Sequence, residues 1–182
     1  HHRHEPHDSS RYPCLGCDGT TITNCTFTGG PTLVAATSPQ YYYIEAKSVT
    51  GLKIVDNTFK MDVSGGSARQ GIDSASLTNA VISNNLFVDI HEHAIYTNIF
   101  DSTISNNVIT YSQSATDQLG TALKFSGGAN TVTGNAIYNA ALGGITGYLC
   151  YNTVIADNAI REHGYVGIEI GNNSAASSGL YG

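Results

Sequence analysis

Six copies of a short motif place a polar side chain directly after an Ile or Leu. The residues at this position are Glu45, Asp73, Tyr96, Lys124, Thr146 and Glu169. Carboxylates, a phenol and an amine are the groups that remove or donate protons in general acid–base catalysis. His91 and His93 come shortly before Tyr96, and Arg69, which suits bidentate binding of a carboxylate, precedes Asp73. The sequence therefore gathers groups for proton transfer and carboxylate binding around one repeated motif.

A second repeated motif indicates the elements that position these residues. Six segments place an apolar residue on either side of a polar one, followed by a polar corner residue and another apolar residue. They cover residues 21–27, 52–59, 81–87, 103–109, 131–137 and 153–160, and their equivalent corner residues are Cys25, Asn57, Asn85, Asn107, Asn135 and Asn158. The corner recurs every 22 to 32 residues. One such repeat cannot bury its own apolar side chains, whereas stacked repeats share a core, so the pattern predicts a solenoid.

The predicted fold is all-β: a right-handed parallel β-helix solenoid of about six coils with an Asn ladder. The corner Asn residues are expected to pair with one another along the stack and to adopt the left-handed backbone of a sharp turn. Cys25 is expected to end the ladder. A β-sandwich would also contain evenly spaced short strands, but it gives no reason to repeat Asn at one corner. We expect a His-rich arm at residues 1–19, the β-helix at 20–171 and a tail at 172–182.

This pattern resembles the pectate-lyase-like superfamily of right-handed parallel β-helices, through its repeated Asn and its Gly-Ile strands over roughly residues 20–171. That superfamily includes polysaccharide lyases, glycoside hydrolases, uronate epimerases, phage tailspikes and adhesins. The resemblance is therefore specific for the fold and unspecific for the activity. It implies an extracellular or cell-surface protein that acts on, or lies alongside, polysaccharide.

The resemblance also implies roles in lyase or epimerase chemistry on an acidic polysaccharide, although no family motif matches residue by residue. Lys124 would act as base or charge neutraliser, Tyr96 as acid or base, and His91 or His93 as a second proton carrier. The predicted catalytic residues are Lys124, Tyr96, His91, His93 and Asp73, and the predicted substrate-binding residues are Arg69, Glu45 and Glu169. Asp73 and Glu45 are also candidate calcium ligands, because calcium prefers oxygen ligands.

Strand alternation predicts that the residue before each Ile or Leu also points outward. These residues are Tyr43, Gly71, Ala94, Ala122, Gly144 and Gly167, and from Gly71 onward their small size predicts a shallow groove that would hold a polysaccharide. The long insertions at Thr28–Gln40, Lys60–Gln70 and Thr110–Thr121 fall on one edge and are expected to border the binding side. Two alternatives stay open: the polar column is only a solvated face, or the chain is a noncatalytic structural, adhesive or glycan-binding module that associates through its ends.

Composition narrows the classes of partner. The formal net charge is −6 with no Lys/Arg cluster, which argues against binding of nucleic acid, and no apolar run approaches transmembrane length.

Cys14 and Cys17 are expected to form a short disulfide or to remain two free thiols, and Cys25 to be buried as a small apolar residue. The N-terminal histidines, His1, His2, His4 and His7, could bind copper, nickel or zinc or form part of a disordered arm.

Overall fold

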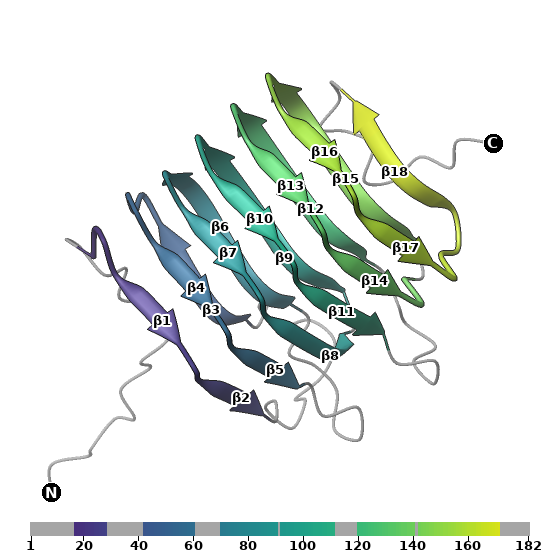
Figure 1. The fold of residues 1–182 in the computed structure, drawn as a ribbon, viewed down its shortest axis with the longest axis horizontal. Coiled ribbons are helices and arrows are strands. Elements are labelled where there is room, and N and C mark those ends of the chain that lie inside the picture. The colour runs from purple at the N-terminus through teal and green to yellow at the C-terminus, as the bar shows by residue number, and fades with distance from the viewer. Residues whose placement is uncertain are drawn as a thin grey trace, which may run out of the picture.

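The computed structural model describes residues 17–28, 42–60, 70–90, 92–111, 120–140 and 142–171, which form eighteen β-strands (Figure 1). Sheet A contains β1 (Thr21–Thr23), β4 (Lys53–Val55), β7 (Val81–Ser83), β10 (Thr103–Ser105), β13 (Thr131–Thr133) and β16 (Val154–Ala156). Sheet B contains β2 (Thr26–Thr28), β5 (Thr58–Lys60), β8 (Leu86–Ile90), β11 (Val108–Tyr111), β14 (Ala136–Tyr138) and β17 (Ala159–Arg161). Sheet C contains β3 (Tyr42–Lys47), β6 (Gln70–Thr78), β9 (His93–Phe100), β12 (Thr121–Gly128), β15 (Gly143–Tyr151) and β18 (Val166–Gly171).

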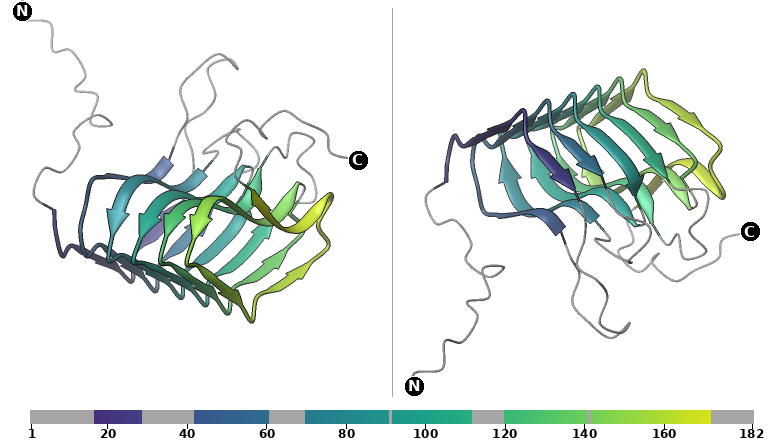
Figure 2. Two further views of the ribbon diagram at one scale, coloured as in Figure 1. Left: turned by 90° about the horizontal axis from the view of Figure 1, so that it is seen from above. Right: turned by 90° about the horizontal axis from the view of Figure 1, so that it is seen from below.

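Every strand pairs in parallel with its equivalents in the neighbouring coils, so successive strands of a sheet are three elements apart in the chain. Figure 2 shows the coils stacked one behind another, from the purple N-terminal coil to the yellow C-terminal coil. The parallel β-helix expected from the sequence is confirmed, and its strands lie within the predicted range 20–171. The described residues contain no helix that could span a membrane.

The core consists of columns of apolar side chains, one residue per coil. In sheet A the column runs through Ile22, Ile54, Ile82, Ile104, Val132 and Ile155. In sheet B the rings of Phe27, Phe59 and Phe87 stack, with centroids 4.8 and 4.6 Å apart and planes within 7° of parallel. Phe59 and Phe87 are fully buried, and each such side chain contributes roughly 1.5–3 kcal/mol. The repeat therefore stabilises the stack through contacts between coils.

The Asn ladder occupies the turn between sheets A and B. From Asn57 to Asn135, the backbone N–H and the side-chain Nδ2 of each Asn donate to Oδ1 of the Asn in the next coil, at 2.9–3.1 Å. Each Nδ2 also donates to a carbonyl of the preceding coil, as Asn85 does to Ile54 at 2.9 Å. The N–H of Cys25 donates to Asn57 Oδ1 at 3.0 Å, but its thiol cannot extend the ladder, as expected.

The left-handed backbone, however, lies one residue before the ladder, which corrects the expectation. At this turn the residues with positive φ are Asn24, Asp56, Asn84, Asn106, Gly134 and Asp157, with values of 54–67°. Each ladder Asn directs its N–H and carboxamide along the stack, so the preceding residue takes the change of chain direction. At Gly134 a Cβ would lie 2.3 Å from Asn106 Oδ1, which explains the glycine among Asn and Asp residues.

A second, shorter ladder occupies the turn between sheets C and A and was not predicted. The N–H of Ala80 donates to Ser102 Oγ at 2.9 Å, and the N–H of Ser102 donates to Asn130 Oδ1 at 3.1 Å. Asn130 Nδ2 in turn donates to the Ile99 carbonyl at 3.0 Å. Because this ladder spans only three coils and mixes residue types, it leaves no clear repeat in the sequence.

The cysteines differ in part from expectation. Cys17 is disulfide-bonded, whereas Cys25 and Cys150 are free thiols. Cys25 is exposed rather than buried, because no described coil packs against the N-terminal side of β1 and β2. The His-rich arm up to residue 16, the tail at 172–182 and most of the predicted insertions lie outside the described residues.

Candidate functional site on the outer face of sheet C

The predicted column of polar residues lies in register along sheet C. Cα pairing connects Glu45, Asp73, Tyr96, Lys124, Thr146 and Glu169 in this order, one per coil. Tyr96 is 38% exposed, and Asp73 and Lys124 are partly buried. Thr146 differs from the others because it is buried and its hydroxyl donates to Thr121 Oγ1 at 3.2 Å. The parallel register therefore brings functional groups far apart in the chain onto one face.

The predicted groove of small residues is wrong. Gly71, Ala94, Ala122 and Gly144 are buried, and a Cβ on Gly71 would lie 2.6 Å from the Ala94 carbonyl oxygen and 2.7 Å from the Phe87 ring. Gly71 and Ile72 therefore both pack inside, so strict strand alternation fails where sheet C meets sheet B. A second column lies three residues before the first and contains Tyr42, Gln70 and His93 in register. Tyr42 is partly exposed, whereas Gln70 and His93 are buried.

Tyr42 and Asp73 form a hydrogen-bonded pair on this face, with the Tyr42 hydroxyl donating to the carboxylate. Burial raises the pKa of Asp73, and the nearby Glu45 carboxylate raises it further, against the opposing effect of Lys47. Burial also raises the pKa of Tyr42 to about 12, with Asp73 and Glu45 adding to the effect. Lys47 forms an ion pair with Glu45. Asp73 therefore keeps its proton to a higher pH than an ordinary aspartate.

His93 is buried between Glu92, Tyr96 and Thr121. Its Nδ1 lies 2.7 Å from the Thr121 carbonyl oxygen and its Nε2 lies 3.8 Å from Glu92 Oε1. Burial lowers the pKa of His93 to about 4, with a smaller opposing effect from the Thr121 hydrogen bond. The ring is therefore neutral at pH 7, and a proton on Nδ1 donates to Thr121. Nε2 is then the basic nitrogen, and the ring centroid lies 5.3 Å from that of Tyr96.

Lys124 lies between two tyrosine rings. Its Nζ is 4.9 Å from the centroid of Tyr96 and 5.3 Å from that of Tyr148, both within the range of cation–π attraction. Burial lowers the pKa of Lys124, although the carboxylates of Glu92 and Glu169 favour its charged form. Tyr148 has a raised pKa, through burial first and Glu169 second. The ammonium is thus held in place by aromatic faces and is easier to deprotonate than that of an exposed lysine.

A comparison with protein families finds that residues 43–179 match the family described as the right handed beta helix region. The chain belongs to this family of right-handed β-helices. Searches of curated proteins and of solved structures found no match.

Within this β-helix, four of the predicted catalytic residues come together: Asp73, Tyr96, His93 and Lys124. Glu45 lies at one end of the column and Glu169 at the other. His91 and Arg69 lie outside the described residues. The roles assigned to all these residues stay predictions.

Sequence reasoning missed four residues of the β-helix face: Tyr42, Gln70, Glu92 and Tyr148. Tyr42 and Gln70 stand three residues before Glu45 and Asp73, as His93 stands three before Tyr96. This constant offset was visible in the sequence and could have identified the second column. Tyr148 stands two residues after the Thr146 position, as Lys47 does after Glu45, and alternation alone places both outward.

Calcium ligation by Glu45 and Asp73 stays a prediction. Within the described ranges, no group of three or more His, Cys, Asp or Glu residues could hold a metal ion.

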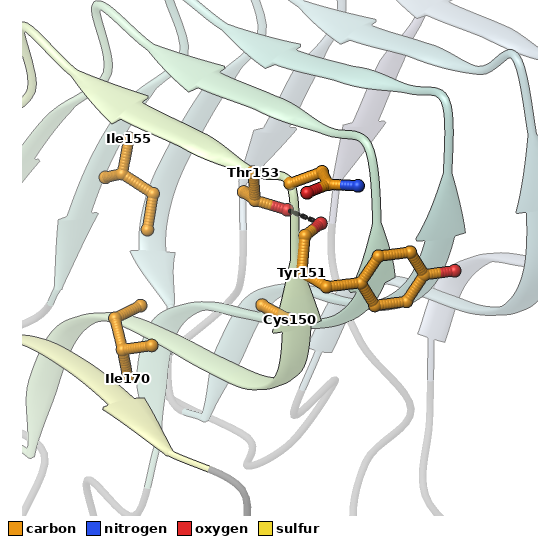
Figure 3. Close-up of a pocket in the computed structure, with 6 residues that line it drawn as sticks. Cys150, Tyr151, Thr153, Ile155 and Ile170 are labelled. Atoms are coloured by element: carbon orange, nitrogen blue, oxygen red, sulfur yellow. Dashed lines mark hydrogen bonds between the residues drawn. The ribbon is translucent and has the colours of Figure 1, made fainter.

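A cavity of about 350 Å³ lies at the C-terminal end of the β-helix (Figure 3). Ile155 and Ile170, which line it, belong to inward-facing columns of the last described coil. Thr153 Oγ1 donates to the Tyr151 carbonyl at 3.1 Å on its rim. Only Cys150 and Ile155 of its lining pack against the core, whereas Tyr151 and Ile170 are 57% and 56% exposed. We therefore regard this cavity as an open hollow at the end of the stack, distinct from the titratable cluster of sheet C.

Proposed function

We propose that this β-helix acts on polysaccharide outside the cytoplasm, through lyase- or epimerase-type proton transfer at an acidic sugar on the outer face of sheet C. The observation that supports this most is the position of Lys124, whose ammonium lies between Tyr96 and Tyr148 on the same face as neutral His93. Perturbed titratable groups cluster more often at functional sites than elsewhere on a protein.

The chemistry requires a base, a cation and an acid. The base breaks the C–H bond next to the sugar carboxylate, and a cation stabilises the charge that develops on that carboxylate. In a lyase, a carbon–carbon double bond then forms as the bond to the neighbouring glycosidic oxygen breaks, and an acid protonates that oxygen. No oxidant or other co-reactant is needed.

The residues of the face match these three requirements. Lys124, with its lowered pKa, serves as the base, or as the cation while His93 Nε2 is the base. Tyr96 is the candidate acid, and Asp73, whose ionised carboxylate accepts the Tyr42 hydrogen bond, is a second proton carrier because its raised pKa favours proton uptake. Arg69 is the proposed second cation, and Glu45 and Glu169 the proposed contacts to hydroxyl groups along the glycan. Strands of neighbouring coils lie about 4.8 Å apart, so a glycan along the stack would meet one coil after another.

The test measures ultraviolet absorbance of unsaturated uronate products on pectic, alginate and glycosaminoglycan substrates, with epimerisation followed by NMR. Lys124→Met should lower turnover by about 100-fold or more, the usual contribution of a general base. Lys124→Arg retains the cation but cannot release a proton, so it separates the base from the neutralising role. Lys53→Met, which removes an exposed lysine of sheet A, is the matched control and should leave turnover unchanged. Equal turnover in all three folded variants would refute the proposed site.

A noncatalytic glycan-binding or structural module is the second candidate, and one observation favours it. The described part of the face holds four carboxylates, Glu45, Asp73, Glu92 and Glu169, but only two ammonium groups, of which Lys47 is paired with Glu45. Because negative groups outnumber positive ones on this face, it attracts a polyanion only weakly. In addition, Ile168 and Ile170 of the last described coil are 47% and 56% exposed, so an assembly through this end is part of the second candidate. Glycan binding by folded protein without any product would support it.

A further inference from the structure

Among the described residues, three buried side-chain oxygen atoms lack a hydrogen-bond donor: Gln70 Oε1, Glu92 Oε2 and Asn98 Oδ1. Two of them, Gln70 Oε1 and Glu92 Oε2, lie where the sheet C strands β6 and β9 begin. Gln70 is only 1% exposed, so bulk water does not solvate its carboxamide. A buried acceptor without a donor costs about 1–3 kcal/mol, and more when it is charged. Native proteins rarely keep such groups without a reason, and a bound ligand that supplies the donors is one such reason.

The two acceptors belong to one small region of the face. Gln70 lies between Tyr42 and His93 in the register of sheet C, and Glu92 directly precedes His93. Glu92 Oε1 faces His93 Nε2 at 3.8 Å, which leaves Oε2 for another partner. The Asp73 carboxylate lies three residues from Gln70 on the same strand and is bonded to Tyr42. We call Gln70, Asp73 and Glu92, with Tyr42 and Tyr96 at their borders, the acceptor subsite.

Resting on the proposed function, we further propose that the acceptor subsite binds the protonated amino group of an amino sugar that adjoins the acidic sugar in the glycan. The subsite offers one amide oxygen and two carboxylates, all of which accept hydrogen bonds when the carboxylates are ionised. A primary ammonium supplies three donors and a positive charge, so it satisfies more of these acceptors than a single hydroxyl does. Charge-assisted hydrogen bonds of this kind are about twice as strong as neutral ones.

The face already accommodates one ammonium group. Lys124 Nζ lies over the rings of Tyr96 and Tyr148, with the Glu92 and Glu169 carboxylates near enough to favour its charge. The chain's own ammonium thus uses the same combination of tyrosine faces and carboxylates that the acceptor subsite offers to a ligand. A metal ion is a poorer occupant, because no three metal-binding side chains meet among the described residues.

The experiment compares glucosamine oligomers with N-acetylglucosamine oligomers of the same length by calorimetry, using the whole chain. The free-amine oligomers should bind about tenfold tighter or better, and the difference should shrink at high salt. Glu92→Gln and Gln70→Met, which remove a charge and an acceptor at nearly constant size, should each weaken amine binding by about tenfold. Asp56→Asn is the matched control, because it removes an exposed carboxylate at a turn where other coils have Asn. It should not change the affinity.

Each outcome decides the proposal. Equal binding of the two oligomers, or amine binding that Glu92→Gln and Gln70→Met leave intact, overturns it. Binding of calcium chloride alone that both variants abolish also overturns it, since the subsite is then a metal site. Thermal unfolding of each variant verifies the fold, and Gln70→Met is expected to retain it because an unpaired buried acceptor is removed. Amine binding without lyase or epimerase product leaves the subsite standing and refutes the proposed catalysis, whereas product without amine preference does the reverse.

Discussion

The Asn ladder and the acceptor subsite are both buried polar regions of the same stack, yet their hydrogen bonding is opposite. In the ladder, Asn107 Oδ1 accepts two hydrogen bonds from Asn85, and Asn107 Nδ2 donates to Ile82 and to Asn135. In the acceptor subsite, Gln70 Oε1 and Glu92 Oε2 have no donor. The ladder lies at the turn between sheets A and B, while the subsite lies on the outer face of sheet C.

The difference separates residues that stabilise the stack from residues that are available to a ligand. A fully satisfied buried network favours one structure and strengthens it, whereas a partly satisfied one costs free energy. Sites of function are where such a cost is most often retained. Substitutions in the ladder should therefore reduce stability, and substitutions in the subsite should reduce binding while stability is kept or raised.

The largest effect is expected for Asn107→Ala. This substitution leaves the N–H and the Nδ2 of Asn85 and the carbonyl of Ile82 short of a partner, all inside the stack. With about 1–3 kcal/mol for each unsatisfied buried group, we expect the free energy of unfolding to fall by about 3–5 kcal/mol. Chemical denaturation measures it, with Asn106→Gly as control, because Asn106 is an exposed turn residue with φ of 54° and glycine adopts this conformation without strain. A loss below about 1 kcal/mol would show that water replaces the ladder at little cost.

His93 gives the next largest effect, through pH. Its pKa is about 4 in the folded protein and 6.5 in the unfolded chain, so between these values the unfolded state binds a proton that the folded state does not. The contribution of His93 is therefore fully present above pH 6.5 and is lost as the pH falls toward 4. It amounts to about 3 kcal/mol. In His93→Gln, which keeps an amide donor for Thr121, the loss of unfolding free energy over this pH range should be smaller by about that amount. An unchanged pH dependence would mean that His93 is protonated inside the fold.

The ladder and the column of sheet C were predictable from the sequence because a parallel solenoid preserves residue equivalence from coil to coil. The recurrence of Asn107 and its equivalents identified the turn, and the residue after each inward Ile identified the column that includes Tyr96 and Lys124. Fixed register converts a sequence repeat directly into spatial neighbours. For these two features it was therefore unnecessary to predict which distant elements of the chain pair.

The second column, of Tyr42, Gln70 and His93, was missed because local geometry departs from ideal alternation. Gly71 and Ile72 both face the core, so period-two reasoning placed Gly71 on the outside and overlooked Gln70. Burial and the lack of a donor at Gln70 depend on the packing of neighbouring coils, which no residue pattern records. The left-handed conformation was assigned one residue too late for a similar reason, since the direction of the Asn side chain decides which residue must turn.

The smallest effect, and the one of opposite sign, is expected for Asp73→Asn. The pKa of Asp73 is raised in the folded protein, so the fold binds a proton more tightly than the unfolded chain does. Stability is therefore lost as the pH rises from 3.8 through the higher folded value, and at pH 7 the charge of Asp73 is a net cost. Asparagine keeps an oxygen that accepts the Tyr42 hydrogen bond and removes this charge. Because Asp73 is only half-buried and solvent screens it, we expect a gain of about 0.5–1 kcal/mol at pH 7 and none at pH 3.

Thermal unfolding of Asp73→Asn at both pH values measures this gain, with Asp56→Asn as the matched control. Asp56 is exposed at a turn where Asn84 and Asn106 are its equivalents, so its substitution should change stability by less than about 0.5 kcal/mol at either pH. Binding or turnover should fall in Asp73→Asn and not in the control, because only Asp73 belongs to the acceptor subsite. If Asp73→Asn instead destabilises the protein at pH 7, Asp73 is a structural partner of Tyr42 and Lys47. The contrast between a satisfied ladder and an unsatisfied subsite would then be limited to Gln70 and Glu92.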